Sequence, residues 1–309
     1  MPKSTTSNVS LSDETSSNKQ VFAEITIIAE SDSADPPEPP LDSAYGWVVA
    51  LSSCFILMIS VGPVSSFGIY LSEYRINVFP TTPSSTLSWI GSLQFGFMTL
   101  CGVGAGILVE RFDTRIIIAL SSIVTGMAFI LASFCKIPLT LIFTQEILFG
   151  VGGSCLMISS TSLTAQWMEK YRSVATGIAS TGISIGGLWM SFATEEMVSK
   201  LGWQWSLRIT GFVIIGVGFV AGMFMRRRIE VTKRDKIVDF SVLSDIKFIL
   251  LFLAAVLVAG AYYIPFYFMP SYAEEVIGRS SIWGANTSSI LNASGIAGRI
   301  LMGMLADNV

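Results

Sequence analysis

Eight stretches of this sequence are apolar, and each is long enough to cross about 30 Å of hydrocarbon as a helix. They lie near residues 46–70, 84–109, 115–134, 139–166, 173–193, 204–225, 246–268 and 282–305. Because lipid offers no partner to a free backbone N–H or C=O group, each span must be helical. Only 13% of the residues are charged, about half the share usual in soluble globular proteins. The sequence therefore predicts an all-α, multi-pass integral membrane protein.

Residues 1–43 differ in composition from the rest of the chain. They carry eight acidic residues against two lysines, they are rich in Ser and Pro, and they have no helical apolar period. This composition predicts a disordered acidic tail, and the lack of a basic start before an apolar core excludes a secretory signal. We expect a six-helix bundle over 44–225, a basic hinge loop over 226–245, and the first two helices of a second bundle over 246–309.

Basic residues are distributed unequally between the loops. If the tail is cytoplasmic, the loops on its side hold eleven Lys or Arg residues and those on the other side hold four. This asymmetry predicts a cytoplasmic N-terminus. The most basic loop, "MRRRIEVTKRDK", is expected to separate two halves of the protein and to contact anionic lipid.

One small pattern occurs twice, 197 residues apart. Gly106 is followed four positions later by Glu110, and Gly303 by Asp307, each time at the end of an apolar run. The two copies close the second and the eighth predicted helix, so the repeating unit is six helices and a hinge. Two complete units would contain twelve helices, and we therefore expect the sequence to be a fragment or a truncated product that stops after helix 8.

The first copy, with Arg111 and Arg115 after its acid, resembles the loop signature of the major facilitator superfamily. In that family the cluster stabilises one end of the alternating-access cycle. Gly106 is expected to permit close helix contact, and both arginines to pair with Glu110. The family usually has glycine where this chain has Asp113. The resemblance implies a conformational switch made of Gly106, Glu110, Arg111, Arg115, Gly303 and Asp307.

Four further segments resemble the monocarboxylate transporter family. They are "DSAYGWVVALSS" before and in helix 1, "RSVATGIASTGISIGG" in helix 5, "YIPFYFMPSYAEEVIG" in helix 7 and "ASGIAGRILMGMLAD" in helix 8. The Pro-rich acidic run before the first segment suggests the fungal branch, whose members include riboflavin permeases. Two positions depart from proton-coupled lactate carriers: Ser65 replaces a lysine, and Gly295 replaces an aspartate. A monocarboxylate and another organic anion both remain open as the solute.

Arg299 lies about two turns from the end of helix 8. A guanidinium at such depth costs roughly 2.5–3.5 kcal/mol, so it should face a polar cavity or a partner. Either it binds an anionic substrate, as the resemblance implies, or it reaches back to the lipid headgroups. Tyr263 and Tyr267 of helix 7 belong either to an interfacial aromatic belt or to a gate that binds the solute. Ser65, two residues after the helix-breaking Pro63, is expected to line the same cavity.

Glu146 is the only carboxylate well inside a predicted span. Burial favours the protonated form of a carboxyl group, which makes Glu146 the candidate for proton coupling. The alternative is a structural hydrogen bond to a neighbouring helix. Arg208 and Lys247 lie near the ends of their spans. Arg208 is expected to reach back to the lipid headgroups, and Lys247 to be an interface anchor.

Several enzyme classes are excluded by residue types. The chain has no histidine, and its four cysteines follow no metal-ligand spacing. The stretch "GISIG", 182–186, matches a serine-nucleophile motif, but it lies in a helical span and has no histidine base, so its glycines are expected to serve helix packing. We expect neither enzyme activity, nor a cofactor, nor a metal, nor nucleic-acid binding.

These features together predict a secondary carrier that moves a small organic solute by alternating access. The expected partners are that solute, membrane lipid and, if transport is proton-coupled, protons in symport; no obligate protein partner is indicated. The expected location is the plasma membrane, with the vacuolar membrane as the alternative. Two other functions stay open: a sensor or scaffold without transport, and an inert fragment of a carrier.

Overall fold

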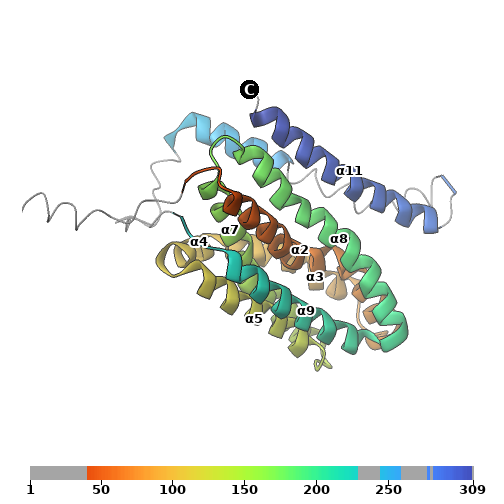
Figure 1. The fold of residues 1–309 in the computed structure, drawn as a ribbon. Helices are drawn as coiled ribbons and strands as arrows, with labels where there is room; N and C mark the ends of the chain where they lie inside the picture. Colours follow the sequence, from red (N-terminus) through yellow and green to blue (C-terminus); the bar gives the residue numbers. More distant parts are fainter. Residues whose placement is uncertain (1–39, 229–243, 259–276, 279–280, 308–309) are drawn as a thin grey trace, which may run out of the picture. The chain divides into compact units, whose positions relative to one another are not determined.

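The structure is a computed structural model that describes residues 40–228, 244–258, 277–278 and 281–307. The described residues are helical and contain no strand (Figure 1), which confirms the predicted all-α fold. In chain order the elements are α2 (Ala44–Glu73), η1 (Tyr74–Val78), α3 (Ser84–Leu100), α4 (Gly102–Arg111), α5 (Thr114–Ala132), α6 (Pro138–Leu141), η2 (Ile142–Leu148), α7 (Phe149–Trp167), α8 (Arg172–Leu201), α9 (Trp203–Phe224) and α11 (Ser281–Asp307). A further helix, Ile246–Val258, precedes α11.

Two of the predicted spans are not regular helices. The span expected at 84–109 consists of α3 and α4, with non-helical backbone at Ile90 and Gly91 and a bend of 43° between Leu93–Leu100 and Gly102–Arg111. The span expected at 139–166 begins with the short helix α6 and the π-helical segment η2 before α7. Hydropathy predicts where a span lies, whereas these irregularities depend on contacts with neighbouring helices.

Helix α2 packs against α7, α8 and α9, and α5 packs between α7 and α9. Small residues bring α2 and α8 into backbone contact. A Cβ atom at Gly182 would overlap the carbonyl group of Cys54, and one at Gly186 would lie 2.5 Å from the carbonyl oxygen of Met58. The "GISIG" stretch is therefore a helix-packing surface and not a nucleophile turn.

The outer surface of the bundle is apolar, as a lipid-facing surface must be. On α5 the exposed side chains Ile116, Leu120, Ile123, Met127 and Leu131 follow one another at intervals of three or four residues. Four helices among the described residues are long and apolar enough to span a membrane, and the bent pair of α3 and α4 provides a fifth candidate. The protein is an integral membrane protein.

Hydrogen bonds tie several helix ends together at one end of the bundle. The Asp113 carboxylate accepts a bond from the Arg115 N–H and caps α5. Tyr45 donates to the carbonyl of Phe224, and Trp167 donates to that of Arg226, each over 2.8 Å. These bonds satisfy carbonyl groups at and just after the end of α9, which have no helical partner of their own.

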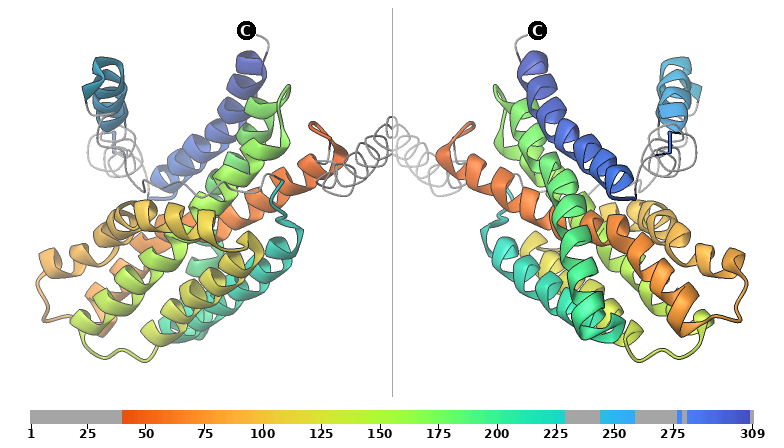
Figure 2. Two further views of the ribbon diagram at one scale, coloured as in Figure 1. Left: turned by 90° about the vertical axis from the view of Figure 1, so that its left-hand side faces the viewer. Right: turned by 90° about the vertical axis from the view of Figure 1, so that its right-hand side faces the viewer.

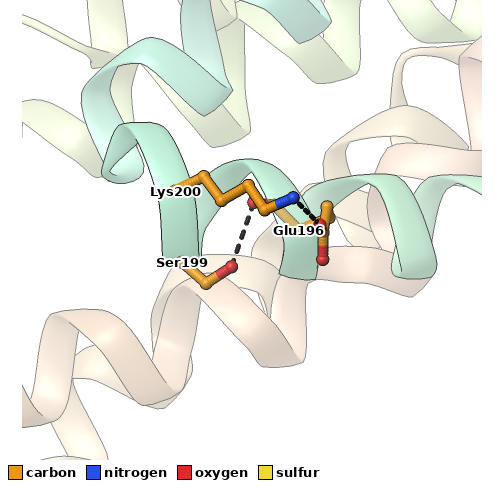
Figure 3. Close-up of polar contacts among 3 residues, drawn as sticks. All are labelled: Glu196, Ser199 and Lys200. Atoms are coloured by element: carbon orange, nitrogen blue, oxygen red, sulfur yellow. Dashed lines mark hydrogen bonds and ion pairs between the residues drawn. The ribbon is translucent and has the colours of Figure 1, made fainter.

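The opposite end of α8 carries an ion pair between Lys200 and Glu196, one helical turn apart (Figure 3). Ser199 donates a hydrogen bond of 3.0 Å to the carbonyl of Glu196. Both charged side chains are about two-thirds exposed, and such surface pairs contribute little to stability. Glu196 is thus an exposed glutamate, whereas Glu146 is buried.

Candidate functional site

Helix α11 lies along α8 in antiparallel orientation (Figures 1 and 2). The contact runs from Gly303, which touches Ser173 near the start of α8, to Gly295, which lies against the Ser184 hydroxyl three turns later. Between them, a Cβ atom at Gly177 would lie 2.7 Å from the carbonyl oxygen of Arg299. Glycines on both helices therefore allow this close approach.

A group of polar side chains lies where α11, α8 and α2 meet. The Arg299 guanidinium donates a hydrogen bond to the Ser184 hydroxyl. A Cβ atom at Gly187 would lie 3.1 Å from Ser65 Oγ and 3.5 Å from Asn292 Oδ1, so both side chains lie close to that glycine. We call Ser65, Ser184, Asn292 and Arg299 the α8–α11 polar site.

The α8–α11 polar site is suited to hold an anion or a carbonyl group. Arg299 supplies a permanent charge with donors in a planar fork, and the hydroxyl and amide groups supply further donors and acceptors. Arg299 is half-buried and Ser184 is buried, whereas Ser65 is exposed. The site therefore combines an exposed hydroxyl group, that of Ser65, with a half-buried positive charge, that of Arg299.

Sequence reasoning missed Ser184 and Asn292. Ser184 is the central residue of "GISIG", where the pattern drew attention to glycine packing. Its role depends on the register between α8 and α11, two helices more than a hundred residues apart. Tyr263 and Tyr267, expected to contact the solute, lie outside the described residues.

The second copy of the glycine–acid pattern makes specific contacts with α8. The Asp307 carboxylate accepts hydrogen bonds of 2.8 Å from the backbone N–H groups of Ser173 and Val174, in the first turn of α8. Desolvation opposes ionisation of Asp307, but these bonds prevail and hold the pKa of its carboxyl below the ordinary value. A carboxylate at this position also complements the helix dipole of α8.

A second carboxylate binds the turn that leads into α8. Asp42 accepts bonds of 3.1–3.4 Å from the N–H groups of Glu169, Lys170 and Tyr171. These bonds lower the pKa of the Asp42 carboxyl group, and the bond from the Lys170 N–H has the largest effect. The start of α2 and the end of α11 are thus both attached to one short segment, residues 169–174.

The first copy of the pattern lies in different surroundings, and two contacts expected of it are not found among the described residues. A Cβ atom at Gly106 would meet no described atom within 4 Å, so this glycine is not at a close helix contact in the described part of the chain. Neither Arg111 nor Arg115 forms an ion pair with Glu110 there. Instead Arg227 donates to the carbonyl groups of Val109 and Glu110 and caps the end of α4.

Glu146 is fully buried in η2, and neither of its carboxylate oxygens has a hydrogen-bond partner in the part of the chain that the structure describes. Its segment, η2, packs mainly against α3 and α5. Arg208 contacts three side chains of the protein. It donates a hydrogen bond of 3.0 Å to Ser133 Oγ. Its guanidinium carbon lies 4.5 Å from the ring centre of Phe134 and 5.0 Å from that of Trp205. The described residues include no group of three or more acidic, Cys or His side chains that could bind a metal ion.

A family model and individual known proteins both match most of this chain. The family model described as Major Facilitator Superfamily matches residues 43–309. The chain is 29% identical over 309 residues to the Agnestins efflux protein AgnL12 of Paecilomyces divaricatus, covering 99% of the chain and 71% of that protein. It is 30% identical over 277 residues to the MFS-type transporter pynF of Aspergillus niger, and 30% over 278 residues to the Aspyridones efflux protein apdF of Emericella nidulans. These two alignments cover 88% and 89% of the chain but 64% and 56% of the relatives.

Proposed function

The chain belongs to the major facilitator superfamily, and from this we propose that it is a secondary transporter that exports a small organic anion by alternating access. Two similar proteins carry the word efflux in their names, which supports an outward direction. The relatives differ in the compounds named, so the solute of this chain is given as a chemical class. A monocarboxylate is the simplest member of that class.

The hydrogen bond between Arg299 and Ser184 carries this proposal. It places a guanidinium at the contact between α8 of the first six helices and α11. A buried or half-buried arginine binds carboxylates through two parallel, charge-assisted hydrogen bonds. Ser65 and Asn292, both near Gly187, are in position to contact the uncharged part of the solute.

In the proposed cycle, the Asp307 contact holds one end of the transporter closed. Asp307 connects α11 to the first turn of α8 at the end of the bundle that the loop charges predict to be cytoplasmic. An inward-open state requires the two helices to separate there, which breaks both bonds. In our proposal the N-terminus is cytoplasmic and the protein lies in the plasma membrane, so that export delivers the anion outside the cell.

Substitutions of Arg299 test the substrate assignment. Cells that express the protein are loaded with radiolabelled benzoate or pyruvate, or with the corresponding uncharged amides, and release is measured. We expect export of the anions and not of the amides. Arg299→Ala should reduce export about 10- to 100-fold, since one charge-assisted interaction is worth about 1.5–3 kcal/mol. Arg299→Lys should retain part of the rate, because it keeps the charge but loses the planar fork.

Arg208→Ala is the matched control, because that arginine contacts Ser133, Phe134 and Trp205 away from the polar site. Export by this variant, corrected for the amount of protein in the membrane, should stay within about twofold of the parent. Equal export of amides and anions, or full activity of Arg299→Ala, would show the anion assignment to be wrong. Binding without release would instead indicate a sensor.

A further inference from the structure

Helix α3 is interrupted inside its membrane span. Ile90 has an extended ψ of 122°, and Gly91 has a left-handed φ of 97°. After the interruption the helix resumes at Leu93–Leu100, and the first N–H groups of a helix have no partner within it. A helix N-terminus within the hydrocarbon region is costly unless other groups satisfy it.

The interruption is packed against η2, the π-helical segment that contains Gln145 and Glu146. Gln94, in the first turn after the break, donates from Nε2 to the carbonyl of Gln145 over 3.4 Å. Tyr74 of η1 donates to Gln145 Oε1 over 3.1 Å. Gln94, Gln145, Glu146 and Tyr74 are all at most 1% exposed, and we call them the η2 cluster. Such π-helical segments occur frequently at functional sites.

The atoms of the η2 cluster that have no partner are all acceptors. They are both carboxylate oxygens of Glu146 and Oε1 of Gln94. Buried polar atoms are nearly always hydrogen-bonded, so unpaired ones indicate a missing partner. No described donor forms a hydrogen bond with these three oxygens, and a proton on Glu146 supplies one.

Among the described residues, the elements packed against Glu146 bring no opposite charge near it that could stabilise a permanent carboxylate. Helices α3, α6 and α7 carry no Asp, Glu, Lys or Arg, and the one charged residue of α5, Arg115, is at its far end. The titratable side chains nearby are Tyr70, Tyr74 and Cys135, and none of these is basic. The backbone N–H of Gln94, at the start of Leu93–Leu100, faces the carboxyl group. This N–H and the helix dipole offer partial compensation when the proton leaves.

We propose that Glu146 is a reversible proton-binding site, built at the break in α3 and separate from the α8–α11 polar site. In one state the carboxyl group is protonated and its O–H serves the unpaired acceptors of the η2 cluster. In the other state the O–H bond breaks, the proton passes to water, and the carboxylate faces the N-terminal N–H groups of Leu93–Leu100. A hard metal cation fits less well, because it takes about six oxygen ligands and the cluster offers three unpaired ones.

Infrared difference spectroscopy of the purified protein tests this site without any transported solute. The pH is varied in choline buffer, and the C=O stretching band of protonated carboxyl groups is followed. At about pH 6 a free glutamate, with a reference pKa near 4.3, is ionised. We expect the parent protein to retain a protonated-carboxyl band at that pH, to lose it reversibly at higher pH, and to lack it altogether after Glu146→Gln.

Glu196→Gln is the matched control, since it makes the same change at an exposed glutamate paired with Lys200 (Figure 3). This variant should keep the band. Three results would overturn the proposal: a band absent from the parent at pH 6, a band that survives Glu146→Gln in a folded protein, or a band removed by sodium at constant pH. The last would assign the site to a metal ion. None of these results depends on Arg299, so the export proposal stands or fails separately.

Discussion

At the scale of single residues, two copies of one pattern have acquired different environments. Gly303 is buried against the backbone of Ser173, and Asp307 binds the N–H groups of Ser173 and Val174. A Cβ atom at Gly106 would meet no described atom within 4 Å, and in the described structure it is the carbonyl of Glu110 that accepts a hydrogen bond. The sequence predicted both motifs equally well, because the pattern is the same. Which copy forms a contact depends on the surface it faces, and a motif does not specify that.

This difference predicts opposite effects of one substitution at two positions. Gly303→Ala places a Cβ atom 2.7 Å from the Ser173 carbonyl oxygen, and such overpacking costs on the order of 1–3 kcal/mol. Gly106→Ala adds a Cβ in open space and should be neutral or stabilising by about 0.5–1 kcal/mol, as alanine is in a helix. Thermal unfolding of the purified protein in detergent measures both. An equal loss of stability in the two variants would contradict the assigned contacts.

At the scale of elements, the main departure from expectation is the break in α3. The apolar run over 84–109 predicted one continuous span, and Gly91 alone gave no signal that set it apart from Gly96 five residues later. The low helix propensity of a single glycine is too weak to break a helix in a membrane. The break is maintained by contacts from Phe67 of α2 and from η2, which come from other parts of the chain.

The two glycines of α3 provide a test. Gly91→Ala forces a left-handed conformation on a residue with a side chain, at about 1–2 kcal/mol, and its Cβ would overlap the ring of Phe67. Gly96→Ala meets nothing within 4 Å and serves as the control. We expect a lower unfolding temperature only for Gly91→Ala. Unchanged stability of this variant would mean that α3 is continuous there in solution.

At the scale of the whole molecule, both copies of the glycine–acid pattern lie at one end of the bundle, where a series of hydrogen bonds connects them. Arg227 binds the end of α4, and Trp167 binds the neighbouring Arg226. Asp42 binds the segment after Trp167, and Asp307 binds the start of α8 that follows it. With the distribution of basic residues, this places the shared end in the cytoplasm in our proposal.

Chemical labelling checks this topology. Single cysteines are introduced in a cysteine-free background at Phe112 and Ala306, which are exposed near the two motifs, and at Ser199, which is exposed at the opposite end of α8. A membrane-impermeant maleimide should label position 199 in intact cells, and positions 112 and 306 only after the membrane is permeabilised. Labelling of positions 112 and 306 from opposite sides would rule out the parallel repeat.

The sequence by itself determined that the chain is helical and lies in a membrane, and its motifs indicated the family. The first two properties follow from local hydrophobicity and from the need of every backbone group in lipid to be bonded within its own helix. Only the tertiary structure decided that Ser184 and Asn292 join Arg299, that Asp307 rather than Glu110 holds a helix end, and that Glu146 faces a broken helix. Each depends on the register between helices distant in the chain, which is set by the packing of small residues across their interfaces.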